Sequence, residues 1–511
     1  MLLVHNFLEN SATDFPDKVA LVYGDQRLTY SQINGMSNRM AHALQDHGLK
    51  RGDRVALYLP NSIELVVGIF ATLKAGGVFV VVNATTKKDK LAYMVGNCRA
   101  QAIITRGQAA SVIEGVIKED PSVQYTIFTD KQAETAVSAL PDSQTFAEIQ
   151  TVYPETAVSN HCIDQDLACL IYTSGSTGDP KGVMSAHSNV VFAASSIITY
   201  LENTPDDIIF SALPISFDYG LYQLLMAFKF GGTLILEKTF AYPSKALRIM
   251  AQEKATVFPG VPTMFALLLQ MDLSKYDLQS LRAITNTAAA LPPKHIQEIR
   301  EIFPWTTLYS MYGLTETKRT LYLPPAQLDS RPGSVGIAIP GTEVWLEDEQ
   351  GQRLGPNEIG ELVIRGGHVM RGYWENAEAT AHRYRPGPLP NERVCYSDDL
   401  FRMDEEGFLY FVGRKDDIIK SRGEKVAPKE VENVIYALPG ITETAVIGVP
   451  DPILGEAIKA FIVTQRNDLA EKDVIRHCRA NMEDFMVPQI IEFIPELPKT
   501  SSGKITKKNL S

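Results

Sequence analysis

Residues Leu170-Ile171-Tyr172-Thr173-Ser174-Gly175-Ser176-Thr177-Gly178-Asp179-Pro180-Lys181-Gly182 form the most informative stretch of this 511-residue chain. Its apolar start predicts a buried strand, and that strand enters a loop rich in glycine and hydroxyl side chains that ends in Lys181. Glycines let successive backbone N–H groups turn toward one anion, while hydroxyls add donors and the lysine adds a positive charge. The stretch therefore predicts a loop that binds a triphosphate. It is not a Walker A loop, because Pro180 stands where that motif needs a glycine.

Strand and helix patterns alternate on both sides of this loop. Apolar runs at 54–59 and 78–82 predict buried strands with an amphipathic helix between them, and the alternation resumes over 167–325. Because successive strand–helix–strand units build parallel sheets, the chain is predicted to have an α/β fold. Short β-rich segments with many glycines and prolines at 330–412 predict a β-barrel or a small sheet, of which the β-barrel is preferred.

Composition narrows the possible partners. A chain of this length is expected to fold into about two to four domains. The 49 Lys and Arg against 60 Asp and Glu give a net charge of −11, which argues against nucleic acid or an anionic membrane as the main partner. No apolar run reaches the roughly 18 residues that span a bilayer. The five cysteines lack CxxC spacing and suit a reducing compartment, so a cytoplasmic location is expected.

Three further motifs follow the loop along the chain. They are Tyr309-Ser310-Met311-Tyr312-Gly313-Leu314-Thr315-Glu316-Thr317, Cys395-Tyr396-Ser397-Asp398-Asp399-Leu400 and Leu497-Pro498-Lys499-Thr500-Ser501-Ser502-Gly503-Lys504-Ile505. With the loop, they resemble the motifs of the AMP-forming, adenylate-forming ligases, a family that includes acyl-CoA synthetases and the adenylation domains of nonribosomal peptide synthetases. The resemblance covers essentially the whole chain. It implies an enzyme that uses ATP and Mg²⁺ to convert a carboxylic acid into an acyl-adenylate with release of pyrophosphate.

The resemblance also implies how the chain is divided. Residues 1–415 are expected to form a large N-terminal domain of two stacked α/β subdomains plus the β-barrel, and residues 416–511 a small, mobile α+β domain. Asp416 would be the hinge, and Gly423 would line the passage for an incoming thiol. Lys504 would bridge the substrate carboxylate and the phosphate, where it stabilises charge that develops during attack on the α-phosphorus.

Each motif contributes residues to the implied ATP site. Tyr312 would stack on adenine, Thr315 would hold the α-phosphate, and Glu316 would bind Mg²⁺, a hard cation that prefers carboxylate and phosphate oxygens. Asp399 would accept both ribose hydroxyls, and Arg414 would reach the same ribose. The expected nucleotide-binding set is Thr173, Ser174, Gly175, Ser176, Thr177, Gly178, Lys181, Ala288, Ala289, Tyr312, Gly313, Thr315, Asp399 and Arg414. The expected catalytic set is Lys504, Thr173, Lys181 and Glu316.

One position departs from the family pattern. Asp398 stands where the family has glycine, directly before the ribose ligand Asp399. A second carboxylate near phosphates is unfavourable unless it points away or meets a cation. The role of Asp398 is left open by the sequence.

The acid-binding pocket is predicted around Asp218. In amino-acid-activating members of the family, an aspartate at this place pairs with the α-ammonium group of the substrate. A carboxylate that faced an apolar acyl chain without a partner would be costly to bury. This favours a small amino acid, with proline first, over the alternative of a short- or medium-chain fatty acid. The expected pocket residues are Phe217, Asp218, Tyr219, Tyr222, Pro259, Thr285, Thr287, Met311 and Arg319.

Other interpretations of these residues remain. Asp218 also suits the start of a helix, where it would be a satisfied structural residue, and Arg319 also suits recognition of a second carboxylate or orientation of Asp218. No carrier-protein motif follows Lys504 in this sequence. The acyl group is therefore expected to pass to the phosphopantetheine thiol of a separate carrier protein or of CoA. A luciferase-like oxygenase and a catalytically silent nucleotide-binding protein are the alternatives from other functional classes.

Overall fold

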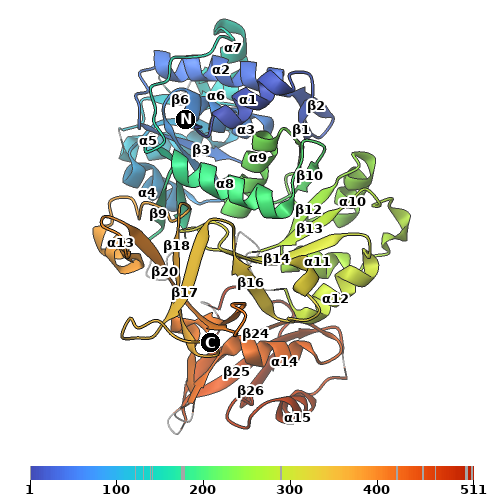
Figure 1. Ribbon diagram of the computed structural model, residues 1–511. Helices are drawn as coiled ribbons and strands as arrows, with labels where there is room; N and C mark the ends of the chain where they lie inside the picture. The colour runs from blue at the N-terminus through green and yellow to red at the C-terminus, as the bar shows by residue number, and fades with distance from the viewer. Residues whose placement is uncertain are drawn as a thin grey trace.

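The computed structural model describes most of the chain (Figure 1). The described residues are 2–120, 122–130, 132–137, 140, 142–173, 179–287, 291–421, 424–451, 454–466, 468–500, 505–507 and 510. Within them, the strands form three sheets, two of which belong to the larger N-terminal part and one to the C-terminal part. None of the described helices is long and apolar enough to cross a bilayer.

The smaller N-terminal sheet carries the predicted phosphate loop. Its strands run in the order β7-β6-β5-β3-β4-β8-β9, and all neighbours are parallel except the β8–β9 hairpin. The strands are β3 (Arg54–Leu59), β4 (Val78–Asn83), β5 (Ala100–Thr105), β6 (Tyr125–Phe128), β7 (Ser143–Thr145), β8 (Leu167–Thr173) and β9 (Lys181–Ala186).

Helices cover both faces of this sheet because its strands are apolar on both sides. Val55 and Leu57 of β3 join one hydrophobic core with helices α2, α3, α8 and α9, whereas the intervening Ala56 joins a second core with α4 and α5. The helices are α1 (Asn6–Asp14), α2 (Tyr30–Asp46), α3 (Ile63–Lys74), α4 (Lys88–Cys98), α5 (Ala110–Glu119), α6 (Ala133–Val137), α7 (Phe146–Val152), α8 (His187–Leu201) and α9 (Asp218–Phe230).

The larger sheet extends from the second α/β subdomain to the C-terminal part. Its order is β17-β18-β20-β21-β16-β15-β14-β13-β12-β10-β11-β1-β2, with β19 paired to β20. Its first strands are β1 (Val19–Tyr23), β2 (Gln26–Thr29), β10 (Ile208–Ser211), β11 (Thr233–Leu236), β12 (Val257–Gly260), β13 (Ala283–Asn286), β14 (Thr307–Tyr312) and β15 (Leu321–Leu323). Helices α10 (Pro243–Gln252), α11 (Pro262–Leu268) and α12 (Pro293–Ile302) accompany them. Strands β10 to β14 and β1 with β11 are parallel, as the alternating pattern predicted.

The predicted β-barrel is the part of the fold expectation that needs correction. The strands concerned are β16 (Ser334–Ala338), β17 (Thr342–Glu347), β18 (Ile359–Gly366), β19 (Tyr384–Pro386), β20 (Arg393–Met403) and β21 (Leu409–Arg414), with helix α13 (Ala377–Arg383) before β19. Among the described residues, these strands continue the antiparallel end of the larger sheet through β15–β16, and no pairing closes them into a barrel. The short segments separated by glycine and proline do form β-strands, but such a pattern does not specify whether the strands close into a barrel.

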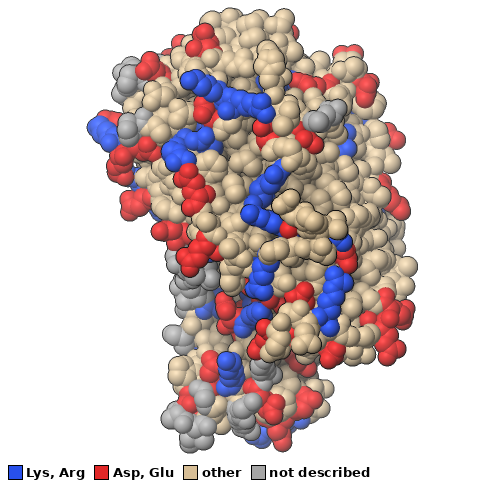
Figure 2. Space-filling model, turned by 60° about the vertical axis from the view of Figure 1, so that its left-hand side comes forward, with Lys and Arg blue, Asp and Glu red and all other residues tan. Residues whose placement is uncertain are grey.

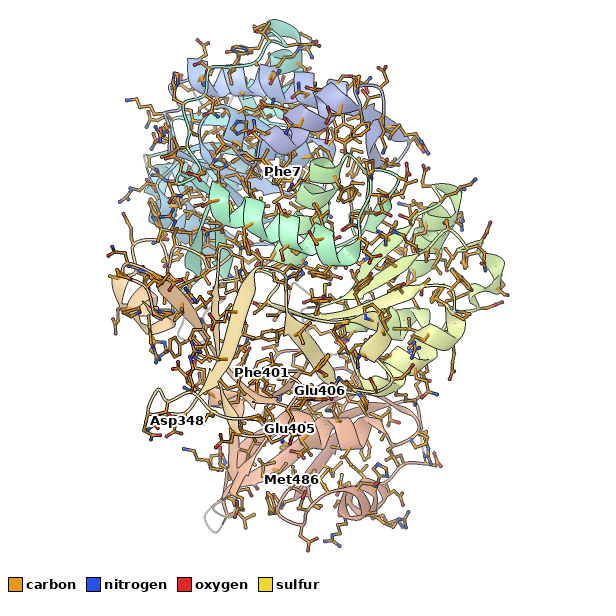
Figure 3. All side chains as sticks on the ribbon, viewed as in Figure 1. Phe7, Asp348, Phe401, Glu405, Glu406 and Met486 are labelled. Atoms are coloured by element: carbon orange, nitrogen blue, oxygen red, sulfur yellow. The ribbon has the colours of Figure 1, made fainter. Side chains whose placement is uncertain are left out.

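The C-terminal part has its own sheet and core. Its strands are β22 (Ile419–Ser421), β23 (Glu424–Val426), β24 (Ile441–Asp451), β25 (Gly455–Thr464) and β26 (Ile490–Phe493), and its helices are α14 (Pro428–Tyr436) and α15 (Glu471–Asn481). Met486 lies in this core, whereas Phe7 lies in the core of the opposite end of the molecule (Figure 3). Acidic and basic side chains are interspersed over the face shown in Figure 2. On this face, the net negative charge is not gathered into one acidic patch.

Candidate active site

The phosphate loop connects the antiparallel strands β8 and β9. Thr173 ends β8 and Lys181 begins β9, and the two residues face each other in the antiparallel register. Because β8 is also paired with β4, the loop leaves the carboxyl-end edge of the parallel strands, where α/β proteins bind ligands. Residues Ser174, Gly175, Ser176, Thr177 and Gly178 lie outside the described residues, so their contacts with phosphate stay predictions.

Lys181 and Glu316 meet at a shared tyrosine that sequence reasoning missed. The Lys181 Nζ atom lies 5.6 Å from the centroid of the Tyr373 ring, and the Tyr373 hydroxyl donates to Glu316 Oε1 at 2.5 Å. Tyr373 follows strand β18 and has no motif around it that would mark it as functional. The tertiary structure therefore places the predicted phosphate-binding lysine over the face of this ring and the predicted metal ligand at its hydroxyl.

Glu316 has the properties of a single-carboxylate magnesium ligand. It is 7% exposed, and the described residues contain no cluster of three or more His, Cys, Asp or Glu that could hold a metal by themselves. Mg²⁺ commonly takes one or two carboxylates and completes its octahedron with substrate phosphates and water. The donor set fits that arrangement. Glu316 would hold the ion, which would neutralise charge on the phosphate oxygens.

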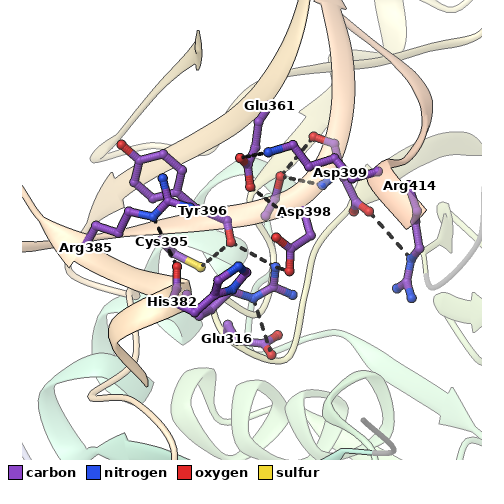
Figure 4. Close-up of polar contacts among 12 residues, drawn as sticks. Glu316, Glu361, His382, Arg385, Cys395, Tyr396, Asp398, Asp399 and Arg414 are labelled. Carbon is purple, nitrogen blue, oxygen red and sulfur yellow. Dashed lines mark hydrogen bonds and ion pairs between the residues drawn. The ribbon is translucent and has the colours of Figure 1, made fainter. Parts of the chain in front are cut away.

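Asp398 meets a cation, which answers the question that the sequence left open (Figure 4). Arg383 of α13 places Nη1 2.6 Å from Asp398 Oδ2 and Nε 3.8 Å from Glu316 Oε1. Burial acts to lower the pKa of Arg383, but Glu316 and Asp398 outweigh it, so the pKa is raised and the guanidinium stays charged. Asp398 also has φ +54°, a conformation that glycine and aspartate adopt more readily than most residues. Aspartate thus satisfies the backbone at the family's glycine position, and Arg383 neutralises its charge.

The predicted ribose ligands are brought together by strand pairing. Asp399 of β20 faces Arg414 of β21 in the antiparallel register, and Arg414 Nε lies 3.6 Å from Asp399 Oδ1. The Tyr312 hydroxyl donates to Asp399 Oδ2 at 2.5 Å, and the Tyr312 ring packs edge-on against Phe401 at 5.0 Å. Figure 3 shows Phe401 in the region where the large sheet approaches the C-terminal domain. The presumed adenine-stacking and ribose-binding side chains therefore form one connected unit.

Burial of Asp399 predicts a pH dependence of nucleotide binding. Burial raises the pKa of Asp399, and Arg414 opposes this only in part. The carboxylate therefore takes up its proton at a higher pH than a free aspartate and loses an acceptor for the ribose hydroxyls. We expect the affinity for adenosine, a ligand without titrating phosphates, to fall from neutral to mildly acidic pH.

The measurement is a series of adenosine dissociation constants at different pH values for the wild type and for Asp399→Asn. The amide variant should bind more weakly at neutral pH and show little further loss on acidification. An identical pH dependence in both proteins would assign the effect to another group.

A close backbone approach shapes the segment that follows Tyr312. A Cβ atom added to Gly313 would lie 1.7 Å from the carbonyl oxygen of Lys318, and the Thr320 N–H donates to the Tyr312 carbonyl at 2.9 Å. Lys318 itself has φ +61°. Residues 313–319 thus fold back tightly, and Thr315, Glu316 and Arg319 lie in this one short loop. Ala288 and Ala289, predicted to lie beside the adenine, are outside the described residues.

The predicted acid pocket is assembled from α9 and the parallel strands beneath it. The Tyr219 hydroxyl lies 2.7 Å from both the carbonyl oxygen and Oγ1 of Thr285, and Thr285 pairs with Pro259 across β12–β13. Arg319 lies over the Tyr219 ring, with 4.6 Å from Cζ to the centroid. The buried members of the predicted set are Tyr219, Tyr222, Pro259, Thr285, Thr287, Met311 and Arg319, and Phe217 is the half-buried residue before α9. The Tyr200 hydroxyl donates to Met311 Sδ at 2.8 Å. Tyr200 is not among the predicted pocket residues.

Asp218 already has a cationic partner. The fully buried Lys318 Nζ donates to Asp218 Oδ1 at 2.7 Å and to the Thr315 carbonyl at 3.0 Å. Asp218 is also the first residue of α9, where a carboxylate interacts favourably with the helix dipole. The premise that this aspartate would lack a partner inside the protein is therefore wrong. Lys318 stands two residues after Glu316, but no local pattern could pair it with an aspartate 100 residues earlier.

The predicted hinge is an exposed connection between two sheets. Arg414 ends β21, Asp416 lies in the 3₁₀ turn Lys415–Asp417, and the C-terminal sheet begins at Ile419. Tyr436 of α14 makes an edge-on ring contact with His295 of α12, so the C-terminal domain packs on the large sheet's helices. Gly423 and Lys504 lie outside the described residues. The boundary at 415/416, the rotation and the roles of these two residues stay predictions.

Comparisons with known proteins agree with this geometry. Residues 8–374 match the family model of the AMP-binding enzyme, and residues 430–504 match that of the AMP-binding enzyme C-terminal domain. The chain belongs to the AMP-binding enzyme family. It is an AMP-forming acid–thiol ligase that uses ATP and Mg²⁺.

Individual relatives of this AMP-binding enzyme extend the comparison. The long-chain-fatty-acid–CoA ligase of Bacillus subtilis is 31% identical over 99% of this chain and 94% of its own length. Tyrocidine synthase 2 of Brevibacillus parabrevis is 29% identical over 98% of this chain, which corresponds to 13% of that protein. Both branches of the family named by the sequence resemblance are thus represented among its relatives.

Solved structures resemble the whole molecule. The anthranilate CoA ligase AuaEII in complex with anthranoyl-AMP has a TM-score of 0.90 at 28% identity and covers 99% of this chain and 95% of its own. The o-succinylbenzoate CoA synthetase of Bacillus subtilis in complex with ATP and magnesium ion has a TM-score of 0.83 at 27% identity, with 99% of both chains covered. The α/β fold with a large N-terminal and a small C-terminal domain is therefore confirmed.

Proposed function

We propose that this AMP-binding enzyme is an acid–CoA ligase that activates a small carboxylic acid without an α-ammonium group. The observation that carries the proposal is the 2.7 Å ion pair between Lys318 and Asp218. The family resemblance implies that an aspartate at this place pairs with the substrate α-ammonium in amino-acid-activating members, whereas here Asp218 is already paired with Lys318 Nζ. A cationic nitrogen brought to the same carboxylate would meet the Lys318 ammonium and be repelled by it.

Side-chain volume supports a small acid. Tyr219, Tyr222 and Met311 are each at most 6% exposed and occupy the predicted acyl pocket. Packed side chains of this size leave little room for an extended chain, because protein interiors have few voids. The name of the Bacillus subtilis relative specifies long-chain acids. The acid used by this enzyme is expected to be shorter than the acids used by that relative.

Resemblance supports CoA as the acceptor. The segment Lys420–Glu432 resembles acyl-CoA ligases more than peptide-synthetase domains, and the names of the Bacillus subtilis ligase and of AuaEII both specify CoA. The reaction consumes the acid and ATP to form acyl-AMP and pyrophosphate, and CoA thiol then displaces AMP to form the thioester.

The test is ATP–pyrophosphate exchange with short carboxylic acids, long-chain fatty acids and amino acids including proline. Thioester formation is then measured with CoA and with a phosphopantetheinylated carrier protein. We expect exchange with short acids and thioester formation on CoA. Asp218→Asn should lower exchange with every accepted acid by a similar factor, because it disturbs Lys318 rather than a substrate contact.

Exchange with proline or another amino acid alone, abolished selectively by Asp218→Asn, would reject this proposal in favour of an amino-acid-activating enzyme. Efficient thioester formation on the carrier protein and none on CoA would reject the proposed acceptor.

A further inference from the structure

The guanidinium of Arg319 is buried without a counter-ion among the residues that the structure describes. Arg319 is 3% exposed, and its Nε and Nη2 atoms are buried without a hydrogen-bond partner among the described residues. Other buried arginines of this chain differ. The side chain of Arg383 is 14% exposed and reaches the Asp398 carboxylate through Nη1, although its Nε is also buried without a hydrogen-bond partner in the described part of the chain. Arg331, 13% exposed, reaches the carboxylates of Asp404 and Glu406. Because an uncompensated buried charge is strongly unfavourable, the free donors of Arg319 indicate a place for a ligand.

The surroundings of Arg319 hold it without using its donors. The Tyr219 ring attracts the cation at 4.6 Å, but a ring face offers no oxygen atom to its N–H groups. The neighbouring Tyr222 is fully buried, and within the described part of the chain its hydroxyl also has no partner. Tyr219 and Tyr222 are three residues apart on α9 and therefore project from one face of the helix. The charge of Arg319 acts on Tyr222, so arginine N–H groups and a tyrosine hydroxyl lie near each other beside α9.

Charge balance identifies the kind of ligand. Asp218 and Lys318 neutralise each other in their ion pair, so the positive charge of Arg319 is left over in the pocket. An α-ammonium group would raise that excess, and a neutral acyl chain would leave it uncompensated. A carboxylate would neutralise it and accept the free hydrogen bonds, because the guanidinium fork matches carboxylate geometry.

We propose that Arg319, with Tyr222, binds a second carboxylate of the substrate, so that the enzyme activates a small dicarboxylic acid. This deepens the proposed function and rests on it. One carboxylate of the acid attacks the α-phosphorus of ATP, and the other is held by Arg319 and is not consumed. The resulting thioester carries a free terminal carboxylate.

The experiment compares dicarboxylic acids with monocarboxylic acids of equal chain length. The pairs are succinate and butyrate, glutarate and valerate, and adipate and hexanoate, each measured by ATP–pyrophosphate exchange. We expect kcat/KM for the best diacid to exceed that of its monoacid partner by about 100-fold or more, because a site with buried polar groups discriminates against an analogue that leaves them unpaired.

Variants of Arg319 assign the preference to this side chain. Arg319→Met should lower kcat/KM for the diacid by about 100-fold more than kcat/KM for the monoacid, which brings the ratio of the two near one. Arg319→Lys should restore part of the diacid preference, mainly through KM. Arg300→Met is the matched control, because Arg300 pairs with the exposed Asp329 on the surface and should keep the wild-type ratio.

Three results would overturn the inference. Equal loss of diacid and monoacid activity in Arg319→Met, with an unchanged thermal unfolding midpoint, would assign Arg319 to the reacting carboxylate or to packing. If Arg319→Met does not fold, the wild-type ratio decides, and a ratio near one rejects the inference. Exchange with monoacids alone rejects this inference but not the ligase proposal, whereas no exchange with any acid rejects both.

Discussion

Replacement of Lys318 by methionine is expected to lower the free energy of unfolding by about 3–5 kcal/mol, because it leaves the Asp218 carboxylate buried and uncompensated. The two side chains are 0% and 12% exposed, so water cannot take the place of the lost ammonium. Lys318 also donates to the Thr315 carbonyl, and Thr315 is the predicted α-phosphate ligand. Exchange activity should therefore fall together with stability. Chemical denaturation of the purified variant measures the first effect, and pyrophosphate exchange the second.

A double-mutant cycle separates the ion pair from the shape of the side chain. Lys318→Met combined with Asp218→Leu removes both charges and should recover much of the lost stability, because replacing a buried pair by apolar groups is often neutral. Lys118→Met is the matched control. Lys118 pairs with Glu114 in an exposed helix position, and its loss should leave the unfolding free energy nearly unchanged. Additive effects of the two pocket substitutions would contradict the ion pair.

Replacement of Gly313 by alanine is expected to disrupt the active-site loop. The added Cβ would lie 1.7 Å from the Lys318 carbonyl oxygen, and the carbonyl carbon of Lys318 and the Cα of Arg319 also lie within 3 Å. These are backbone atoms, so the loop itself must move. We expect a loss of about 2–3 kcal/mol in unfolding free energy. Exchange activity should fall by about 100-fold or more, since a 1 Å displacement of positioning groups has effects of that size.

Gly35→Ala is the control for the glycine substitution. Gly35 lies inside helix α2, and the three atoms nearest to its added Cβ, the first at 3.3 Å, all belong to the exposed, flexible side chain of Glu155. Alanine is the better helix former, so this variant should be equally stable or slightly more stable. A Gly313→Ala protein with wild-type exchange activity would show that the loop can relax and would remove the geometric argument for this glycine.

Local patterns of the sequence were sufficient for the α/β fold class, and they singled out Tyr312, Asp399 and Arg414, which the structure brings together. The strand before Thr173, the glycine-rich loop and Lys181 are contiguous, so their relation needed no tertiary information. Closure of the β-rich region was not predictable, because alternation and turn residues specify strands but not which edge pairs with which. The structure continues these strands from β15 as an open sheet.

The charges of the acid pocket were not predictable either, because they depend on contacts between residues that are remote in sequence. The sequence places Asp218 in the acid pocket but cannot distinguish a carboxylate that pairs with the substrate from one that pairs within the protein. The partner that decides this, Lys318, is 100 residues away. Arg319 was assigned to the pocket with its role left open, and only burial and hydrogen bonding showed that its charge is uncompensated. Tyr373 and Arg383, which contact Glu316, carry no local signal at all.

The amino-acid sequence by itself determined that this chain binds ATP, activates an acid and alternates strands with helices. Those properties reside in contiguous motifs and in hydrophobic periodicity, both of which can be read along the chain. Only the tertiary structure decided which charges are satisfied. Pairing of buried ions depends on distances between residues that are remote in sequence, and the free energy of burying a charge depends on whether its partner is the protein or the substrate.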